Sequence, residues 1–463
     1  YEDKLDRSYY DIPKLIIPGK EATMRCCVYK ERAIVTERVR MAMGGNLDDK
    51  EDSIVEVLDI ACDECPVHSF NVTASCRGCI AHRCVDNCPV QAITIQNHQA
   101  HIDHDKCIEC GKCLQGCPYS AIIKAVRPCE QACKIGAIKM DPTDKKAHID
   151  RSKCMECGAC VYQCPFGAVM DKSYIVDAID ILRGSENNTN YKAYAIIAPA
   201  IVSQFSYAKI GQVVSGIRAL GFHNVIEVAL GADMVAYKEA QELAEKGFLT
   251  SSCCPAFVTY IEKQFPAMAQ HVSHNLSPMA ELGRFIKKAD PTAKVVFIGP
   301  CTAKKHEVKL EKVRDYVDCV LTFEELQALL DSRSIEVDTL EETPLDNASY
   351  YGRIFARSGG LSDAVAQALR ELEIPTKTFT AKPLVCDGIE ECRVALLKAG
   401  KNLLSENFIE GMACQGGCIN GAGCITHGPK SKAEVDKYGK EAMEKTITDA
   451  IRAVQSVDSV KKS

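Results

Sequence analysis

The spacing of the cysteines constrains this chain more than any other feature. The 463 residues include 27 cysteines, and sixteen of these lie between residues 61 and 172. Disulfide scaffolds are short secreted chains, so clustered cysteines in a chain of this length point instead to bound metal. Two dense runs, each ending in Cys-Pro, read Cys76-x2-Cys79-x4-Cys84-x3-Cys88-Pro89 and Cys107-x2-Cys110-x2-Cys113-x3-Cys117-Pro118.

These two runs predict a pair of [4Fe–4S] clusters with crossed ligands. Short loops of this spacing let three thiolates wrap one cubane, while the cysteine before proline reaches the other cluster. A zinc ribbon is the weaker alternative, because it uses four cysteines in two pairs rather than two dense quartets. The predicted ligands of the first cluster are Cys76, Cys79, Cys84 and Cys117, and those of the second are Cys107, Cys110, Cys113 and Cys88.

A partial repeat of the pattern predicts a third cluster. The run ending in Cys164-Pro165 copies the second run, and Cys129 and Cys133 supply half of the first. The same crossover makes Cys133 the fourth ligand of the third cluster. Its other predicted ligands are Cys154, Cys157 and Cys160.

A fourth cluster is left open by the sequence. Cys129 and Cys164 would supply only two of the four thiolates that a cubane needs, and the pair in Cys62-x2-Cys65-Pro66 could supply the other two. Alternatively Cys26 and Cys27 take that role, or the fourth site is empty. Three to four accessory clusters are therefore expected. A chain of cubanes suits electron hopping between a redox site at one end and an electron carrier at the other.

The length and segment pattern predict several domains. Residues from about 191 onward alternate strand-like and helix-like segments, which favours an α/β domain with mostly parallel, helix-covered sheet. Its expected strands are 194–198, 225–228 and 295–298, and its expected helices are 209–220, 232–245, 361–372 and 432–454. The expected division is an N-terminal extension at 1–60 with a helix near 33–43, a two-cluster ferredoxin-like α+β domain at 61–122, a second ferredoxin-like half or repeat at 123–182, a polar linker at 183–190, and the α/β domain at 191–463.

Charge and hydropathy exclude some classes of partner. The formal net charge of −6 gives no basic surface of the kind that nucleic acid requires. No apolar run reaches the roughly 18 residues that a membrane span needs. The charged and polar residues 1–10 do not resemble a signal peptide. We therefore expect a cytoplasmic protein with neither a nucleic-acid nor a membrane partner.

Three further cysteine motifs lie in the α/β region and do not follow ferredoxin spacing. They are Thr-Ser-Ser-Cys-Cys-Pro-Ala-Phe at 250–257, Gly-Pro-Cys-Thr-Ala-Lys-Lys-His-Glu at 299–307, and Glu-Gly-Met-Ala-Cys-Gln-Gly-Gly-Cys-Ile-Asn-Gly at 410–421. Together, and in this order, they resemble the three signature motifs of the iron-only hydrogenases. The resemblance covers about residue 191 to the end, and the ferredoxin-like region also fits that family.

The resemblance implies a composite cofactor, the H-cluster. A [4Fe–4S] cubane would be joined through Cys418 to a di-iron unit that carries carbonyl, cyanide and a dithiolate amine. Lys304 would face a cyanide, since a buried anion needs a charge-assisted donor. Met412 would pack beside the di-iron unit, and the implied cubane ligands are Cys254, Cys301, Cys414 and Cys418. The implied pocket wall includes Pro199, Ser277, Pro278 and Phe355.

The resemblance also implies a proton path. Cys253 lies beside a ligand without binding iron, and in this family that cysteine exchanges protons with the bridgehead amine. The path would continue through Glu239, Ser273 and Glu242, with Glu307 tuning or relaying. Taken alone, two glutamates three residues apart on a helix usually mark only a solvated face, so this path depends on the resemblance.

The implied reaction is the reversible conversion of protons and electrons into H2. The implied partners are a ferredoxin and the maturation enzymes that build the di-iron unit. Phe257, Gly299 and Met279 stand where the family often has Trp, Met and Gln, so we expect a branch distinct from the clostridial enzymes, of the group B type. One hypothesis is that Met279 compensates in volume for Gly299. Three alternative functions remain, namely an iron–sulfur assembly factor, a hydrogen sensor and a polyferredoxin.

Overall fold

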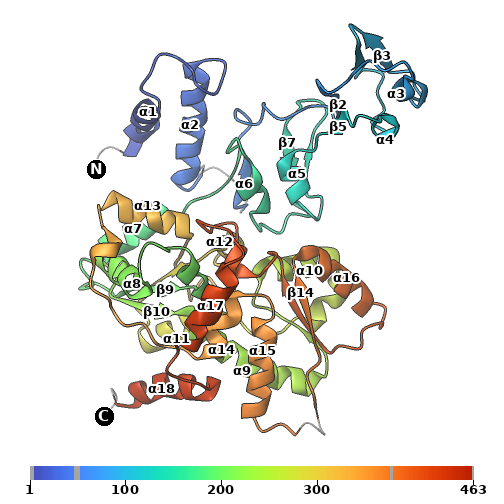
Figure 1. The fold of residues 1–463 in the computed structure, drawn as a ribbon. Coiled ribbons are helices and arrows are strands. Elements are labelled where there is room, and N and C mark those ends of the chain that lie inside the picture. Colours follow the sequence, from blue (N-terminus) through green and yellow to red (C-terminus); the bar gives the residue numbers. More distant parts are fainter. Residues whose placement is uncertain (1–4, 46–52, 376–378, 461–463) are drawn as a thin grey trace.

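The computed structural model describes residues 5–45, 53–375 and 379–460. Figure 1 shows an N-terminal helical hairpin and two small modules above a large α/β domain. Among the helices of these ranges, none combines the length and apolar character that a bilayer crossing requires. The small modules hold the sixteen clustered cysteines, and the α/β domain holds the three later motifs.

The first module has the ferredoxin-like α+β arrangement. Two antiparallel strand pairs enclose a small core that contains Phe70, Ile93 and Ile122 together with cysteine side chains. The β3–β4 hairpin turns at Asn97 and His98, whose positive φ angles of 48° and 60° fit a two-residue turn. Its elements are β2 (Phe70–Val72), α3 (Arg83–Asp86), β3 (Ile93–Gln96), β4 (Gln99–Ile102), α4 (Lys112–Gly116) and β5 (Ile122–Lys124).

The second module is formed by residues that precede the first module in the sequence together with residues that follow it. Strand β1 (Val55–Val57) pairs antiparallel with β8 (Val169–Asp171), just as β2 pairs with β5. The first module is therefore an insertion within the second. Residues 55–57, expected in the N-terminal extension, supply its first strand. The remaining elements of the second module are α5 (Pro128–Ala132), β6 (Ile138–Met140), β7 (Ala147–Ile149) and α6 (Ala159–Gln163).

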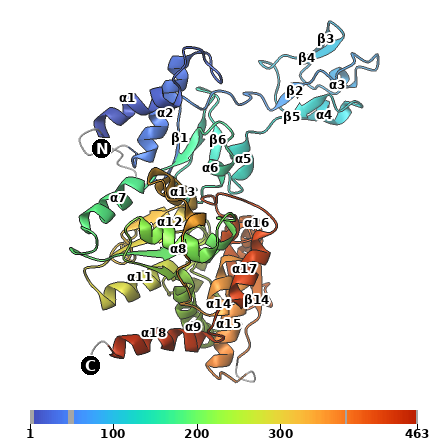
Figure 2. The same cartoon turned by 60° about the vertical axis from the view of Figure 1, so that its left-hand side comes forward.

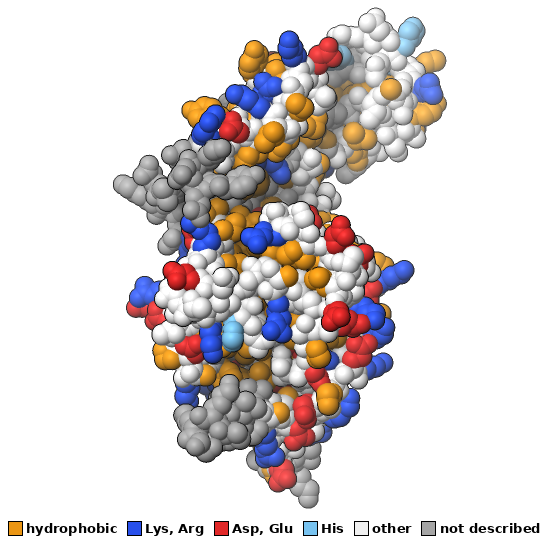
Figure 3. Space-filling view, turned by 90° about the vertical axis from the view of Figure 1, so that its left-hand side faces the viewer, with side chains coloured by type: hydrophobic (Ala, Val, Ile, Leu, Met, Phe, Trp, Pro, Cys, Tyr) orange, Lys and Arg blue, Asp and Glu red, His pale blue; other side chains and the backbone are white. Residues whose placement is uncertain are grey.

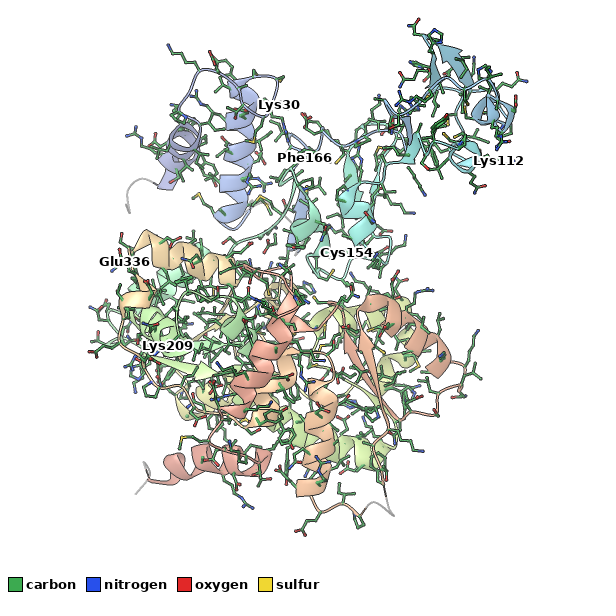
Figure 4. All side chains as sticks on the ribbon, in the orientation of Figure 1. Lys30, Lys112, Cys154, Phe166, Lys209 and Glu336 are labelled. Atoms are coloured by element: carbon green, nitrogen blue, oxygen red, sulfur yellow. The ribbon has the colours of Figure 1, made fainter. Side chains whose placement is uncertain are left out.

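The N-terminal hairpin covers the second module. Helices α1 (Leu5–Ile16) and α2 (Val28–Ala42) pack together, and α2 includes most of the helix expected near 33–43. Arg38 donates a hydrogen bond of 3.0 Å to the carbonyl of Gly167. The guanidinium of Arg25 lies 5.4 Å from the centroid of the Phe166 ring, on the edge of the module that faces the hairpin (Figure 4).

The α/β domain has two lobes, each built on a parallel sheet. The first sheet has the order β10-β9-β12-β13 and the second has the order β11-β15-β14. The strands of the first sheet are largely buried, as expected for parallel strands covered by helices on both faces. The strands are β9 (Ala193–Ile197), β10 (Asn224–Glu227), β11 (Leu249–Thr250), β12 (Lys294–Ile298), β13 (Cys319–Leu321), β14 (Pro383–Asp387) and β15 (Phe408–Met412).

One long helix joins the two lobes. Helix α9 (Val228–Lys246) packs against α11 (Pro278–Ala289) of the first lobe and α15 (Gly360–Glu371) of the second. The other helices of the domain are α7 (Ile175–Gly184), α8 (Ile210–Ala219), α10 (Pro255–Gln264), α12 (Ala303–Glu307), α13 (Phe323–Ser332), α14 (Tyr350–Arg353), α16 (Ile389–Ala399), α17 (Ser431–Lys440) and α18 (Ile447–Val460). Short 3-10 turns are η2 (Pro199–Ser203), η3 (Pro266–His271), η4 (Val337–Thr339), η5 (Ile354–Ala356) and η6 (Cys418–Asn420).

The expected fold class is confirmed, with two local differences. The expected strands at 194–198, 225–228 and 295–298 correspond to β9, β10 and β12. The prediction of a single helix over 432–454 is wrong, because the helix is interrupted between α17 and α18. There the amides of Ile447 and Thr448 donate to the carboxylate of Glu371, a contact that a continuous helix could not make. Residues 175–182, which the expected division places in the second repeat, belong to helix α7, and α7 packs on β13 of the α/β domain.

The modules meet the α/β domain at a narrow junction. Figure 2 shows α6 and β1 of the second module directly above the α/β domain, with the first module farther away. Figure 3 shows the upper body joined to the larger lower body through this narrower region. Any contact between the accessory cysteines and the later motifs is therefore made by the second module.

Candidate functional site

The cysteines predicted to bind the first cluster surround one pocket. Cys76, Cys79, Cys84 and Cys117 all line it, together with apolar side chains that include Ile122. The three predicted cysteines of the second set that are buried or half-buried, Cys88, Cys107 and Cys113, share the module core with them. This arrangement fits the crossed ligand pattern expected from the spacing.

The last cysteine of each run, which is expected to bind the other cluster of its module, accepts a hydrogen bond from a backbone amide. In four places the amide four residues after such a cysteine donates to its sulfur, at 3.2–3.4 Å. Hydrogen bonds to the sulfurs are one of the ways in which a protein tunes an iron–sulfur cluster. The four donor–acceptor pairs are Ala92–Cys88, Ala121–Cys117, Ala137–Cys133 and Ala168–Cys164.

The structure brings together the cysteines needed for a fourth set. Cys129 is buried, and this burial together with the nearby thiols of Cys164, Cys62 and Cys65 raises its pKa to about 12. Cys62 also accepts a 3.4 Å hydrogen bond from the amide of Ala147. Of the alternatives left open by the sequence, the geometry favours the Cys62–Cys65 pair.

Cys26 and Cys27 do not join this group. They lie in the loop before α2, where their sulfurs are 3.9 Å apart. Cys26 is exposed and Cys27 is half-buried. Throughout the described ranges, no three His, Cys, Asp or Glu side chains are close enough to bind one metal ion together. The grouped thiols instead surround hollows, an arrangement that suits the corners of a cubane better than a single zinc ion.

The third set lies at the junction with the α/β domain. Cys133, Cys154, Cys157 and Cys160 line a cavity of about 820 Å³. Cys414, from the third C-terminal motif, lines the same cavity. The accessory cysteines therefore reach the edge of the C-terminal site.

The four C-terminal cysteines converge from loops at the ends of parallel strands. Cys254 caps α10, Cys301 follows β12, and Cys414 and Cys418 follow β15. Burial and, after it, the nearby Cys254 thiol raise the pKa of Cys301 to about 11. Burial also raises the pKa of Cys418, again with Cys301 and Cys254 as neighbours. Sites at the carboxyl ends of parallel strands are the rule in α/β folds.

Close backbone packing holds the third motif in place. A Cβ on Gly421 would lie 2.3 Å from the carbonyl oxygen of Pro300, and a Cβ on Gly417 would lie 2.7 Å from the amide nitrogen of Ser358. Gly417 also has a φ of 93°, which L side chains rarely adopt. Four half-buried thiols held by such tight loops form a donor set that fits an iron–sulfur cubane.

Lys304 and Glu307 form a buried ion pair beside this set. Their Nζ and Oε2 atoms are 2.6 Å apart, and Lys304 also donates a 3.4 Å hydrogen bond to the carbonyl of Cys253. Burial by itself lowers the pKa of Lys304, but the Glu307 carboxylate outweighs it and raises that pKa above its usual value. The site therefore contains a fixed positive charge.

Cys253 lies in a largely apolar pocket. It belongs to the same buried cluster as Met412 and Phe355. Burial raises the pKa of the Cys253 thiol, and the charge of Glu239 raises it further. The Cys253 thiol is therefore protonated and uncharged at neutral pH.

The residues of the expected proton path follow one another in space. Glu239 is fully buried, and burial raises its pKa to about 7. Its Oε1 accepts hydrogen bonds of 3.3 Å from the amide and the hydroxyl of Ser252, while its Oε2 has no partner among the described residues. The Ser273 hydroxyl also influences the pKa of Glu239 and donates a 3.0 Å hydrogen bond to Glu242.

Glu242 forms the outer end of this path. Its Oε1 lies 2.6 Å from the ammonium of Lys246 and 2.7 Å from Nδ1 of His274, both on the surface. Burial tends to raise the pKa of Glu242, but Lys246 and His274 outweigh it and lower that pKa. The Ser273 hydroxyl thus lies between the Glu242 carboxylate, whose pKa is lowered, and the Glu239 carboxyl, whose pKa is near neutrality.

The expected wall residues and the family departures occupy defined places. Pro199 begins η2 after β9, and Ser277 caps α11 directly before Pro278. A Cβ on Gly299 would lie 2.4 Å from the ring of Phe297, so Phe297 occupies the space next to Gly299. Met279 is fully buried in the core of the first lobe. The compensation of Gly299 by Met279 stays a prediction.

Two site residues were missed from the sequence. Lys263 and Lys305 connect the motif-bearing helices to the second module, through partners more than a hundred positions away in the chain. Lys305 immediately follows Lys304 in the second motif, but nothing in the local pattern indicates where its ammonium goes.

Comparison with known proteins agrees with this geometry. The model of the family "iron only hydrogenase large subunit, C-terminal domain" matches residues 191–422, half of the chain. A 4Fe-4S dicluster domain model matches residues 75–121 and 127–168. A solved [FeFe]-hydrogenase structure from Chlamydomonas reinhardtii, 18% identical, covers 61% of this chain and 94% of that one with a TM-score of 0.51, which shows a shared fold.

Two curated relatives differ in kind. Iron hydrogenase 1 of Clostridium pasteurianum is 28% identical over 393 residues, and the match covers 72% of this chain and 66% of that protein. The cytosolic Fe-S cluster assembly factor NAR1 of Kluyveromyces lactis is 41% identical over 91 residues, which is 20% of this chain and 19% of that protein. The chain thus spans slightly less than two thirds of the clostridial relative, and it also resembles a family member named for assembly.

Proposed function

Because this chain belongs to the iron-only hydrogenase family, we propose that it is an [FeFe] hydrogenase that interconverts H2 with protons and electrons. One observation carries the proposal: four half-buried thiols converge beside the buried Cys253, whose carbonyl is bound by the buried cation Lys304. A cubane-carrying assembly factor has no use for a proton-transfer thiol or for a buried cation at this place. The two residues therefore favour a hydrogenase over the assembly role named for NAR1.

The proposed cofactor is the H-cluster, which when bound supplies the iron site at which H2 is split or formed. Cys254, Cys301, Cys414 and Cys418 would hold its cubane, with Cys418 shared with the di-iron unit. Lys304 would donate to an anionic ligand of that unit, since its charge is already fixed by Glu307. Met412 and Phe355 would keep water from the site, and dedicated maturation enzymes would supply the di-iron unit.

Protons are proposed to move along the buried polar groups that start at Cys253. Cys253 passes a proton to Glu239, whose pKa near 7 lets it accept and release protons at neutral pH. The unpartnered Oε2 of Glu239 provides the free acceptor for this step. Ser273 then connects Glu239 with Glu242 at the surface. Glu307 remains available to tune the charge of Lys304.

Electrons are proposed to travel through the modules. Cys157 of the third set is an electrostatic neighbour of both Cys254 and Cys414, so the third cluster is the contact to the C-terminal cubane. A fourth cluster bound by Cys62, Cys65, Cys129 and Cys164 lies in the same module, and the first two clusters lie in the inserted module. A ferredoxin is the proposed external carrier, and a cytoplasmic location is proposed with it.

Infrared spectroscopy of the matured protein tests the function. Expression together with the hydrogenase maturation enzymes should give bands from iron-bound carbonyl and cyanide, and the protein should evolve H2 with reduced ferredoxin. The same sample should contain the iron of four accessory cubanes and the H-cluster, and a protein with three accessory clusters would fall short by the iron of one cubane.

If the protein is instead an iron–sulfur cluster assembly factor, the opposite result is expected. Under it, the matured protein would contain cubanes but show neither diatomic-ligand bands nor hydrogen evolution. That result would exclude the hydrogenase proposal.

Replacing Glu239 with glutamine should slow proton transfer without removing the cofactor. The amide keeps the hydrogen bonds from Ser252 but cannot carry a proton, so H2 turnover should fall by about 100-fold. Burial raises the pKa of Glu239 to about 7, so this carboxyl keeps its proton in the folded protein up to about neutral pH. The wild-type rate should therefore change across neutral pH, where Glu239 loses its proton. That inflection should vanish in the variant.

The pH–rate profile and infrared spectrum of Glu239→Gln are the measurements. Glu245→Gln, an exposed change on the same helix, is the matched control and should behave as wild type. A Glu239→Gln enzyme with the wild-type rate and the wild-type pH inflection would remove Glu239 from the path.

A further inference from the structure

The loop that carries the third set of cysteines is tied to the α/β domain by Lys263. This lysine lies in the last turn of α10, and the same helix begins at Cys254. Its Nζ donates a 2.9 Å hydrogen bond to the carbonyl of Arg151 and a 2.6 Å hydrogen bond to the carbonyl of Cys154. One ten-residue helix therefore has a C-terminal cubane cysteine at its start and the third-cluster loop at its end.

Lys305 makes a second tie from the other motif. It lies four residues after Cys301 and is only 1% exposed. Its Nζ lies 2.7 Å from Asp171 Oδ2 and donates a 2.9 Å hydrogen bond to the carbonyl of Lys172, both at the end of β8 in the second module. The Nζ atom of Lys305 also lies 2.9 Å from Oε1 of Glu325, at the start of α13.

Direct packing completes the contact between these ties. A Cβ on Gly158, which follows Cys157, would lie 2.5 Å from the hydroxyl of Thr302 and 2.8 Å from the Cβ of Ala422. Thr302 in turn follows Cys301. Met155, between Cys154 and Cys157, is buried in the same core as Phe257 of α10. In Figure 4, Cys154 lies where the second module meets the α/β domain.

The two ties act on the loops that carry the ligands of both clusters. Electron tunnelling falls exponentially with the separation of its two centres, so a small shift of one loop changes the rate strongly. Lys263 reaches the main-chain carbonyl of Cys154 and not its sulfur, and Lys305 reaches Asp171, the carbonyl of Lys172 and Glu325. Both hold backbone or carboxylate groups of the module, and their effect is on position.

We propose that Lys305 and Lys263 are positioning residues that set the separation of the third accessory cluster from the C-terminal cubane and so the rate of electron transfer between them. This inference rests on the proposed function for the presence of the two clusters. It adds that, in this chain, the lysines of the two motif-bearing helices hold the electron-carrying module.

Lys305 is expected to have the larger effect. It is buried and satisfies two carboxylates and a carbonyl at once, whereas Lys263 lies on an exposed helix end. Removing the ammonium leaves the half-buried carboxylates of Asp171 and Glu325 without the cation that both contact, and such carboxylates move apart or take up water. The module edge should then separate from α12.

The test uses full-length protein that carries its iron–sulfur clusters but lacks the di-iron unit, prepared without maturation enzymes. Pulsed EPR measures the magnetic coupling between the reduced third cluster and the reduced C-terminal cubane. Rapid freeze-quench after flash reduction measures the rate at which electrons reach the cubane. Lys305→Met and Lys263→Met keep the length of the side chain and remove its charge, and Lys288→Met, in the exposed last turn of α11, is the matched control.

We expect a rate about tenfold lower in Lys305→Met, a smaller reduction in Lys263→Met, and a parallel weakening of the coupling, with iron content unchanged. Lys305→Arg should recover part of both. Wild-type coupling and rate in both methionine variants would overturn the proposal. If Lys305→Met does not fold, Lys263→Met alone decides, since its exposed position leaves folding intact.

The outcome is separable from that of the proposed function. Loss of coupling in the lysine variants together with no carbonyl or cyanide bands in matured protein would retain the positioning role and reject the hydrogenase. The reverse result would retain the hydrogenase and reject the positioning role.

Discussion

Cys253→Ala is expected to lower H2 evolution by between about 100-fold and 10,000-fold, the range that a positioned proton-transfer group contributes. Cys253 is the proposed inner end of the proton path, and its thiol is buried between the apolar wall and Glu239. Alanine leaves the carbonyl that Lys304 binds, so the cofactor should still be incorporated. The loss should therefore appear in turnover and not in the infrared bands.

The measurement is hydrogen evolution with a reduced dye, compared with infrared band intensity in the same sample. Cys319→Ala removes another buried thiol, in the core of the first lobe and outside the three motifs, and serves as the control for simple packing loss. Cys253→Ser should recover part of the activity, because a hydroxyl can occupy the same hydrogen-bonding position. Undiminished turnover in Cys253→Ala would show that protons reach the site by another route.

Lys304→Met is expected to cost about 3–5 kcal/mol of stability, because it leaves the Glu307 carboxylate buried without its partner. Both side chains of the pair are more than nine-tenths buried, so water cannot readily replace the ammonium. The same change removes the proposed donor to the anionic ligand of the di-iron unit. Matured Lys304→Met should therefore also show weak or absent carbonyl and cyanide bands.

A double variant separates the two effects. Lys304→Met combined with Glu307→Gln removes both charges and should recover much of the stability, measured by denaturant unfolding of the cluster-containing protein. It should not recover the infrared bands if Lys304 holds the di-iron unit. Bands of wild-type intensity in the double variant would assign Lys304 a purely structural role.

The presence and grouping of the accessory cysteines could be predicted because the relevant geometry is local. Each run of cysteines lies within a loop and a short helix, so the spacing alone restricts how the thiols can surround a cluster. The strands of the first lobe were predictable for a similar reason, since β9 and β12 are short apolar runs bounded by turns. The helix break before Ile447 was not, because it depends on Glu371 from a distant helix.

The fourth set of cysteines shows where local pattern is insufficient. The sequence left three alternatives for the partners of Cys129 and Cys164. The choice follows from the pairing of β1 with β8, whose residues lie on opposite sides of the inserted module. Such a pairing depends on the whole module folding, and no spacing rule within a single run can indicate it.

By itself the sequence determined the type of chemistry, because cysteine spacing and the three C-terminal motifs define donor sets that only iron–sulfur cofactors use in this combination. Tertiary structure alone decided which thiols meet across the chain, how Glu239 acquires a pKa near neutrality, and how Lys263 and Lys305 join two domains. The physical reason is that burial, charge pairing and close packing are properties of residues brought together from distant positions, and they arise only when the chain has folded.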